Sequence, residues 1–208
     1  MGHRIITVSR QFGSGGREVG KRLADSLGVA YYDREIITAV AERSGLAEEY
    51  TASISERGVN ASFPITFGHT FSYSAAMVDP QVEVMSQQNK LLKSMAEKSD
   101  CVIVGRCADI VLRDYSPFNL FVYAAQESKL ERCRARQGGG EQLSDNELKR
   151  RMAKVDKDRA RYRARLTDSR WGDPAAYHLC LNTTGWDMRA LVDALTPFVR
   201  AWFDRQGM

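Results

Sequence analysis

Residues 5–18 read IITVSRQFGSGGRE, and this stretch decides the fold. Its first part, residues 5–8, is a short apolar run rich in β-branched side chains, which predicts a buried strand. A glycine cluster ends that strand. Apolar residues then recur at helical spacing over 19–27, and Gly28 supplies a helix stop. The expected order is therefore strand, glycine-rich loop and helix.

The same alternation continues along the chain. Two further apolar runs, residues 101–104 and 120–124, are strand-like, and each is followed by a polar, helix-forming stretch. Residues 178–181 read as a last strand, and residues 188–203 as a closing amphipathic helix. This alternation predicts an α/β fold with a parallel sheet.

Length and composition favour one domain over residues 1–208. The chain has 208 residues, of which 43% are hydrophobic, enough for one sizeable core. A net charge of +4 suits a protein that handles phosphate anions, but it is small for a nucleic-acid binder. The four cysteines lack zinc-site spacing, and no leader or membrane-spanning run is present, so we expect a cytoplasmic protein. Oligomeric state is not readable.

The glycine-rich loop is the strongest local signal. Its backbone N–H groups, together with the start of the following helix, are predicted to hold phosphate oxygens through Gly13, Ser14, Gly15, Gly16, Arg17 and Glu18. The Walker A pattern G-x-x-x-x-G-K-S/T would place its first glycine at Arg10, its lysine at Gly16 and its hydroxyl at Arg17. Arg17 is the candidate substitute for the lysine. A glycine turn that only packs strand on helix is the alternative.

Residues 6–18 resemble the opening of the cytidylate-kinase-like proteins. The resemblance continues in Leu27-Gly28, in residues 31–35 (YYDRE), in residues 104–106 (VGR) and in the basic-acidic-basic spacing of Lys154, Asp158 and Arg161. It implies a three-layer P-loop kinase fold, with a five-stranded parallel sheet flanked by helices. It also implies a monophosphate-binding helical insertion, about residues 36–98, and a basic helical lid, about residues 138–168.

The resemblance also implies roles for individual side chains. Arg17, Lys154 and Arg161 would act on the transferring phosphoryl group, and the catalytic Asp158 would orient a neighbouring guanidinium or the acceptor. Arg132 would flank the donor base, and Asp33 and Arg106 would bind the acceptor. Other interpretations remain open: a solvated basic helix for the lid, surface arginines at 106 and 132, and a cap for the helix beginning at Glu35 in the case of Asp33.

The function implied is ATP-dependent phosphoryl transfer to a small acceptor, with CMP or dCMP as the leading candidate. Nucleotide substrates and ATP are the expected partners. Mg²⁺ would require Ser14 or Glu18 to act through water, and no metal ligand is assigned. Tyr123-Ala124-Ala125 replaces an acidic strand end of cytidylate kinases, which leaves the acceptor open. The alternatives are a nucleotide-binding sensor and, opposed by the interleaved Asp156 and Asp158, a nucleic-acid surface on the basic helix.

Overall fold

The computed structural model describes residues 2–33, 80–137 and 143–207. Five parallel strands form one sheet in the order β2-β3-β1-β4-β5. Their bounds are β1 Ile5–Arg10, β2 Ala30–Tyr32, β3 Cys101–Val104, β4 Phe118–Tyr123 and β5 Leu179–Asn182. The first strand is therefore the central one, and its carboxyl end opens into the glycine-rich loop.

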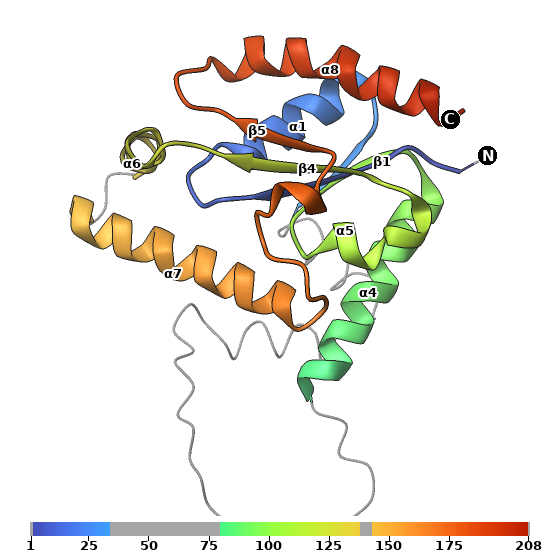
Figure 1. Ribbon diagram of the computed structural model, residues 1–208, viewed down its shortest axis with the longest axis horizontal. Coiled ribbons are helices and arrows are strands. Elements are labelled where there is room, and N and C mark those ends of the chain that lie inside the picture. Colours follow the sequence, from blue (N-terminus) through green and yellow to red (C-terminus); the bar gives the residue numbers. More distant parts are fainter. Residues whose placement is uncertain (1, 34–79, 138–142, 208) are drawn as a thin grey trace, which may run out of the picture.

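Helices cover both faces of the sheet, giving three layers. Figure 1 shows α1 and α8 together on one face, with α4, α5 and α7 on the other. The bounds are α1 Gly16–Leu27, α4 Pro80–Lys98, α5 Ala108–Val111, α6 Gln126–Ala135, α7 Asp145–Ala164 and α8 Met188–Arg205. Two short 3₁₀ turns, η1 Arg113–Tyr115 and η2 Pro174–Ala176, complete the described elements.

Strand residues alternate between two apolar cores. Ile6 and Val8 of β1 pack in the core under α1 and α8, whereas Ile5 belongs to the core under α4 and α5. Because both faces are covered, the strands are apolar almost throughout, which is why they were visible in the sequence. The glycine-rich loop and the turn after β3 both lie at the carboxyl edge of the sheet, where the loops of parallel strands meet ligands.

The predicted parallel sheet flanked by helices is confirmed, with small shifts in bounds. The strand expected at 120–124 spans Phe118–Tyr123 instead. Its start was missed because Asn119, a polar residue, interrupts the apolar run. Its side-chain Oδ1 accepts a hydrogen bond from Thr7 Oγ1 at 2.7 Å, which satisfies it there. Of the predicted insertion, only α4 lies within the described residues. The division into insertion and lid stays a prediction.

Within the three described ranges, no helix is both long enough and apolar enough to span a membrane. The cytoplasmic location stays a prediction.

A buried ion pair fixes the end of α7 to α5. Arg163 Nη1 lies 2.5 Å from Asp109 Oδ2, and the two side chains are 1% and 2% exposed. The same guanidinium donates to Ser169 and stacks over the Tyr177 ring at 5.2 Å. The carboxyl-terminal half of α7 is therefore attached to the core.

We expect Asp109→Ala to lower the free energy of unfolding by about 3–5 kcal/mol, because it leaves the Arg163 charge buried without its carboxylate. Urea denaturation measures this. Asp114→Ala is the matched control, because Asp114 pairs with Arg113 at 3.6 Å on the surface, where both are more than 70% exposed. Equal losses in the two variants would contradict the role given to the buried pair.

Candidate functional site

The glycine-rich loop between β1 and α1 has a backbone that only glycine adopts readily. Gly13 and Gly15 have left-handed φ angles of 76° and 80°. A Cβ at Gly13 would lie 2.9 Å from the Lys129 carbonyl oxygen, and one at Gly15 would lie 2.5 Å from Met188 Cε. The loop therefore runs close to α6 and α8, and only glycine permits this approach at Gly13 and Gly15.

Side chains behind the loop hold its shape. The buried Ser14 Oγ donates to the Gln11 carbonyl at 2.8 Å and lies 3.4 Å from the Gly16 nitrogen. Thr183 Oγ1 donates to the Ser14 carbonyl at 2.7 Å. Arg132 Nη2 donates in turn to the Thr183 carbonyl at 2.6 Å, and burial lowers the pKa of Arg132. Arg132, predicted to flank the donor base, is thus placed next to the loop.

Arg17 and Asp33 were assigned different roles, and the structure brings them together. Arg17 Nε lies 2.7 Å from Asp33 Oδ2, and Asp33 is only 4% exposed. The Tyr31 hydroxyl lies 3.3 Å from both that carboxylate oxygen and the Arg17 carbonyl. Burial, followed by the charge of Asp33, raises the pKa of Tyr31 to about 12. The positive charge of Arg17 is therefore directed at Asp33.

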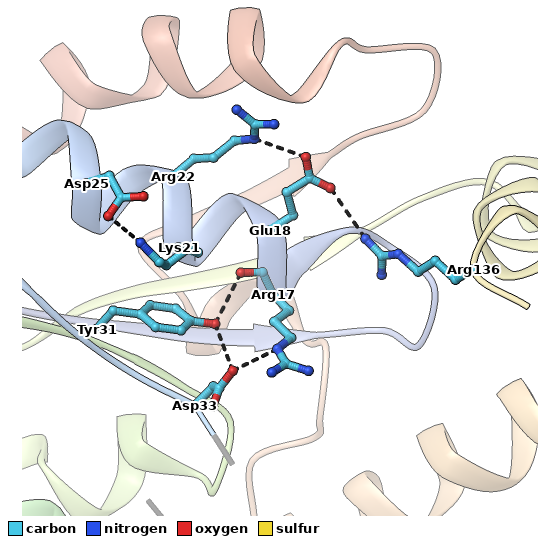
Figure 2. Close-up of a pocket in the computed structure, with 8 residues that line it drawn as sticks. All are labelled: Arg17, Glu18, Lys21, Arg22, Asp25, Tyr31, Asp33 and Arg136. Atoms are coloured by element: carbon cyan, nitrogen blue, oxygen red, sulfur yellow. Dashed lines mark hydrogen bonds and ion pairs between the residues drawn. The ribbon is translucent and has the colours of Figure 1, made fainter. Parts of the chain in front are cut away.

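An open cleft of about 790 Å³ lies beside this pair. Figure 2 shows its lining: Arg17, Glu18, Lys21, Arg22, Asp25, Tyr31, Asp33 and Arg136. The cleft reaches the loop at Arg17 and Glu18 rather than at the glycines. A molecule in it would meet the buried carboxylate of Asp33 at one end.

The two residues considered for Mg²⁺ are committed to protein contacts. Glu18 lies 3.0 Å from Arg22 and 3.3 Å from Arg136, and the Ser14 hydroxyl closes the loop as described. Across the residues that the structure describes, no three His, Cys, Asp or Glu side chains gather as a metal site. These residues do not fit a directly bound metal.

One face of α7 is docked on the loop. Asp156 Oδ1 accepts a hydrogen bond from the Phe12 backbone nitrogen at 2.8 Å and one from Arg159 Nη1 at 3.0 Å. Arg159 Nη1 also donates to the Arg10 carbonyl at 3.0 Å. Burial raises the pKa of Asp156. A carboxylate and a guanidinium from the predicted lid thus hold residues 10–12 of the loop.

The three lid residues predicted from the sequence lie on the other face of α7. Lys154, Asp158 and Arg161 are exposed, and Arg161 Nη1 lies 3.4 Å from Asp158 Oδ1. At 100° per residue, these positions fall nearly opposite Asp156 and Arg159. The structure does not bring them to the loop, and their catalytic role stays a prediction.

Arg106 follows β3 on a strained turn. Gly105, Arg106 and Cys107 have φ angles of 88°, 57° and 49°, so two non-glycine residues are left-handed. A Cβ at Gly105 would lie 1.9 Å from Arg10 Nη1. The turn therefore receives the end of the Arg10 side chain and places Arg106 at the same edge of the sheet.

The sequence of this chain matches known proteins over most of its length. A family model for the cytidylate kinase-like family matches residues 5–185. The chain belongs to the cytidylate kinase-like family. A cytidylate kinase from Haloarcula marismortui is 24% identical over 199 residues, covering 95% of this chain and 90% of the relative.

Solved structures share the fold of this cytidylate kinase-like chain. An uncharacterized protein from Eubacterium ventriosum has a TM-score of 0.70 at 24% identity, covering 95% of this chain and 99% of its own. A shikimate kinase from Bacteroides thetaiotaomicron has a TM-score of 0.55 at 17% identity, covering 95% and 98%. The three-layer P-loop kinase fold is confirmed, and family membership supports a phosphotransferase.

Sequence reasoning missed three residues of the site in this family member. Asp156 and Arg159 share a helix face with the buried Met152 and Arg163, and that spacing was available as a signal. Arg10 was noted only as a departure from the Walker pattern. Its neighbours Gly105, Arg106 and Arg159 are distant in sequence, so only the structure reveals them.

We expect Asp156→Ala to lower the free energy of unfolding by about 1–3 kcal/mol, because it leaves the Phe12 amide without its acceptor. Hydrogen exchange at the Phe12 amide, followed by NMR, should accelerate. Asp158→Ala, on the exposed face of the same helix, should leave that amide unchanged. Equal exchange rates in the two variants would show that α7 does not hold the loop.

Proposed function

We propose that this cytidylate kinase-like protein transfers a phosphoryl group from ATP to a small acceptor, with a nucleoside monophosphate such as CMP or dCMP as the leading candidate. One observation carries the proposal. A glycine-rich loop lies at the carboxyl end of the central strand, and two arginines come to that end from other elements: Arg159 of α7, which donates to the Arg10 carbonyl, and Arg106 on the turn after β3. The relative named cytidylate kinase supports the choice of acceptor.

Phosphoryl transfer depends on neutralising charge and placing donor and acceptor in line, more than on a covalent nucleophile. The loop amides of residues 13–18 would hold the donor phosphates, and Arg132 would lie beside the donor nucleoside. Arg159 and Arg106 would neutralise phosphate charge, because a guanidinium donates two parallel hydrogen bonds to phosphate oxygens.

The acceptor would enter through the cleft beside Asp33. A buried carboxylate accepts hydrogen bonds only, so it suits the hydroxyl or amino groups of a nucleoside. Arg17, held by Asp33 at 2.7 Å, would keep that carboxylate oriented. The catalytic role of Lys154, Asp158 and Arg161 stays a prediction, because α7 is held by Asp156 and Arg163 with these three side chains exposed on its other face.

A second candidate is a nucleotide-binding sensor without turnover. It is favoured by the loop itself, which has Gly16 at the lysine position of the Walker pattern and Arg17 at its hydroxyl position. The commitment of Ser14 and Glu18 to protein contacts points the same way. ATP binding is common to both candidates, so turnover separates them.

The test measures ATP consumption with MgCl₂ against CMP, dCMP, UMP, AMP and GMP, beside ATP affinity from isothermal titration. Turnover that depends on a nucleoside monophosphate would support the kinase. Saturable ATP binding with no turnover for any acceptor would support the sensor. Absence of ATP binding would contradict both.

We expect Asp33→Asn to raise the KM for the acceptor by about tenfold or more, because an amide lacks the charge that orients Arg17 and accepts from the nucleoside. The KM for ATP should change little. Asp114→Asn, on the surface after α5, is the control for loss of a carboxylate. A larger effect on the KM for ATP than on that for the acceptor would place Asp33 on the donor side.

A further inference from the structure

Two departures from the Walker pattern compensate each other in space. A Cβ placed on Gly16 would lie 2.6 Å from Arg10 Cβ and 3.1 Å from Arg10 Cγ. The aliphatic stem of Arg10 therefore fills the volume that a side chain at position 16 would need. Arg10 stands at the first-glycine position of the Walker pattern, and Gly16 stands at its lysine position. The two replacements are coupled, and together they move the cation from the end of the loop to the end of the strand.

The guanidinium of Arg10 ends between the glycine-rich loop and the turn after β3. Its Nη1 lies 1.9 Å from the position that a Cβ on Gly105 would occupy, so the guanidinium is in contact with the Gly105 backbone. Arg159 reaches the Arg10 carbonyl at 3.0 Å, and the charges of both Arg159 and Arg106 act on the guanidinium. Positive charge is thus concentrated at the carboxyl edge of the central strand.

Other cations around the loop are bound to protein acceptors. Arg17 is held by Asp33 at 2.7 Å, Lys129 Nζ donates to Gln11 Oε1 at 3.0 Å, and Arg132 donates to Thr183. Within residues 2–33, 80–137 and 143–207, no acceptor receives a hydrogen bond from the Arg10 guanidinium. Asp33 and Tyr31 act on it only at longer range.

Arg10 is half-buried, and its positive charge is disfavoured there. Burial, followed by the positive charge of Arg159, lowers the pKa of Arg10 to about 9. A folded protein keeps such a cation at a cost, which an anion would relieve by restoring favourable charge and hydrogen bonds. The site is therefore prepared for an anionic ligand.

We propose that Arg10 takes the place of the P-loop lysine, and that its guanidinium binds the terminal phosphate of the nucleoside triphosphate. This inference rests on the proposed function, since it assumes that the loop binds a triphosphate. It assigns the cation to the end of β1 rather than to Arg17. It also explains why position 16 is glycine, because the Arg10 stem already lies there.

The test measures dissociation constants for ATP and ADP by isothermal titration in wild type and Arg10→Met, which keeps an unbranched stem and removes the charge. We expect the dissociation constant for ATP to rise about tenfold to a hundredfold in the variant, as for loss of a charged hydrogen bond. The dissociation constant for ADP should change less than about threefold. The ligand-free melting temperature should be equal or higher. Arg113→Met, an exposed arginine, should leave both constants unchanged.

An exchange variant tests the coupling directly. Gly16→Lys alone should fail to bind ATP preferentially, because the lysine stem collides with Arg10. Arg10→Gly combined with Gly16→Lys should recover the preference for ATP over ADP, and Arg10→Gly alone should not. This comparison decides the question even if Arg10→Met does not fold.

The outcomes separate this inference from the proposed function. Wild-type protein that does not bind ATP would contradict the proposed function and this inference with it. Wild-type binding with an unchanged ATP-to-ADP ratio in Arg10→Met would overturn the inference alone. The same holds if Arg10→Gly retains the preference for ATP.

Discussion

The side chain of Arg10 and the missing side chain of Gly16 share one volume at the end of β1, and the candidate site is arranged around that fact. A Cβ on Gly16 would lie only 2.6 Å from Arg10 Cβ, so the two positions cannot both carry a side chain in this arrangement. Once the arginine is on the strand, its guanidinium must extend along the sheet edge to Gly105. The left-handed turn at Gly105 to Cys107 leaves room for it there.

Contacts from distant parts of the chain stabilise this arrangement. Asp156 and Arg159 of α7 bind the backbone of residues 10–12, and the buried Arg163–Asp109 pair fixes the same helix to α5. Helix α7 thereby connects the glycine-rich loop to α5. Such a network combines buried charges with hydrogen bonds, so its geometry depends on every member being satisfied.

Much of the fold was legible in the sequence, because parallel strands covered on both faces are apolar throughout and α1 has one apolar face. The bounds of β3 and the glycine stop of α1 needed no tertiary information. Asn119 did, since only Thr7 across the sheet makes it acceptable within β4. Local pattern therefore predicted elements well and their edges less well.

The candidate site was predicted only in part, because local sequence pattern does not include contacts between distant residues. Glycines 13, 15 and 16 and Asp33 stand out by type and position along the chain. On α7, charge spacing alone does not say which face meets the loop. The spacing favours Lys154, Asp158 and Arg161, whereas the structure turns Asp156 and Arg159 inward. Arg10 depends on Gly16 and Gly105, a relation that exists only in three dimensions.

The most direct measurement of the central claim is a crystal structure of the protein with a non-hydrolysable ATP analogue. The account predicts that a terminal phosphate oxygen lies about 2.7–2.9 Å from an Arg10 guanidinium nitrogen, as in charge-assisted hydrogen bonds. The loop amides should surround the preceding phosphate. A terminal phosphate bound by Arg17, with Arg10 remote from every phosphate oxygen, would contradict the account.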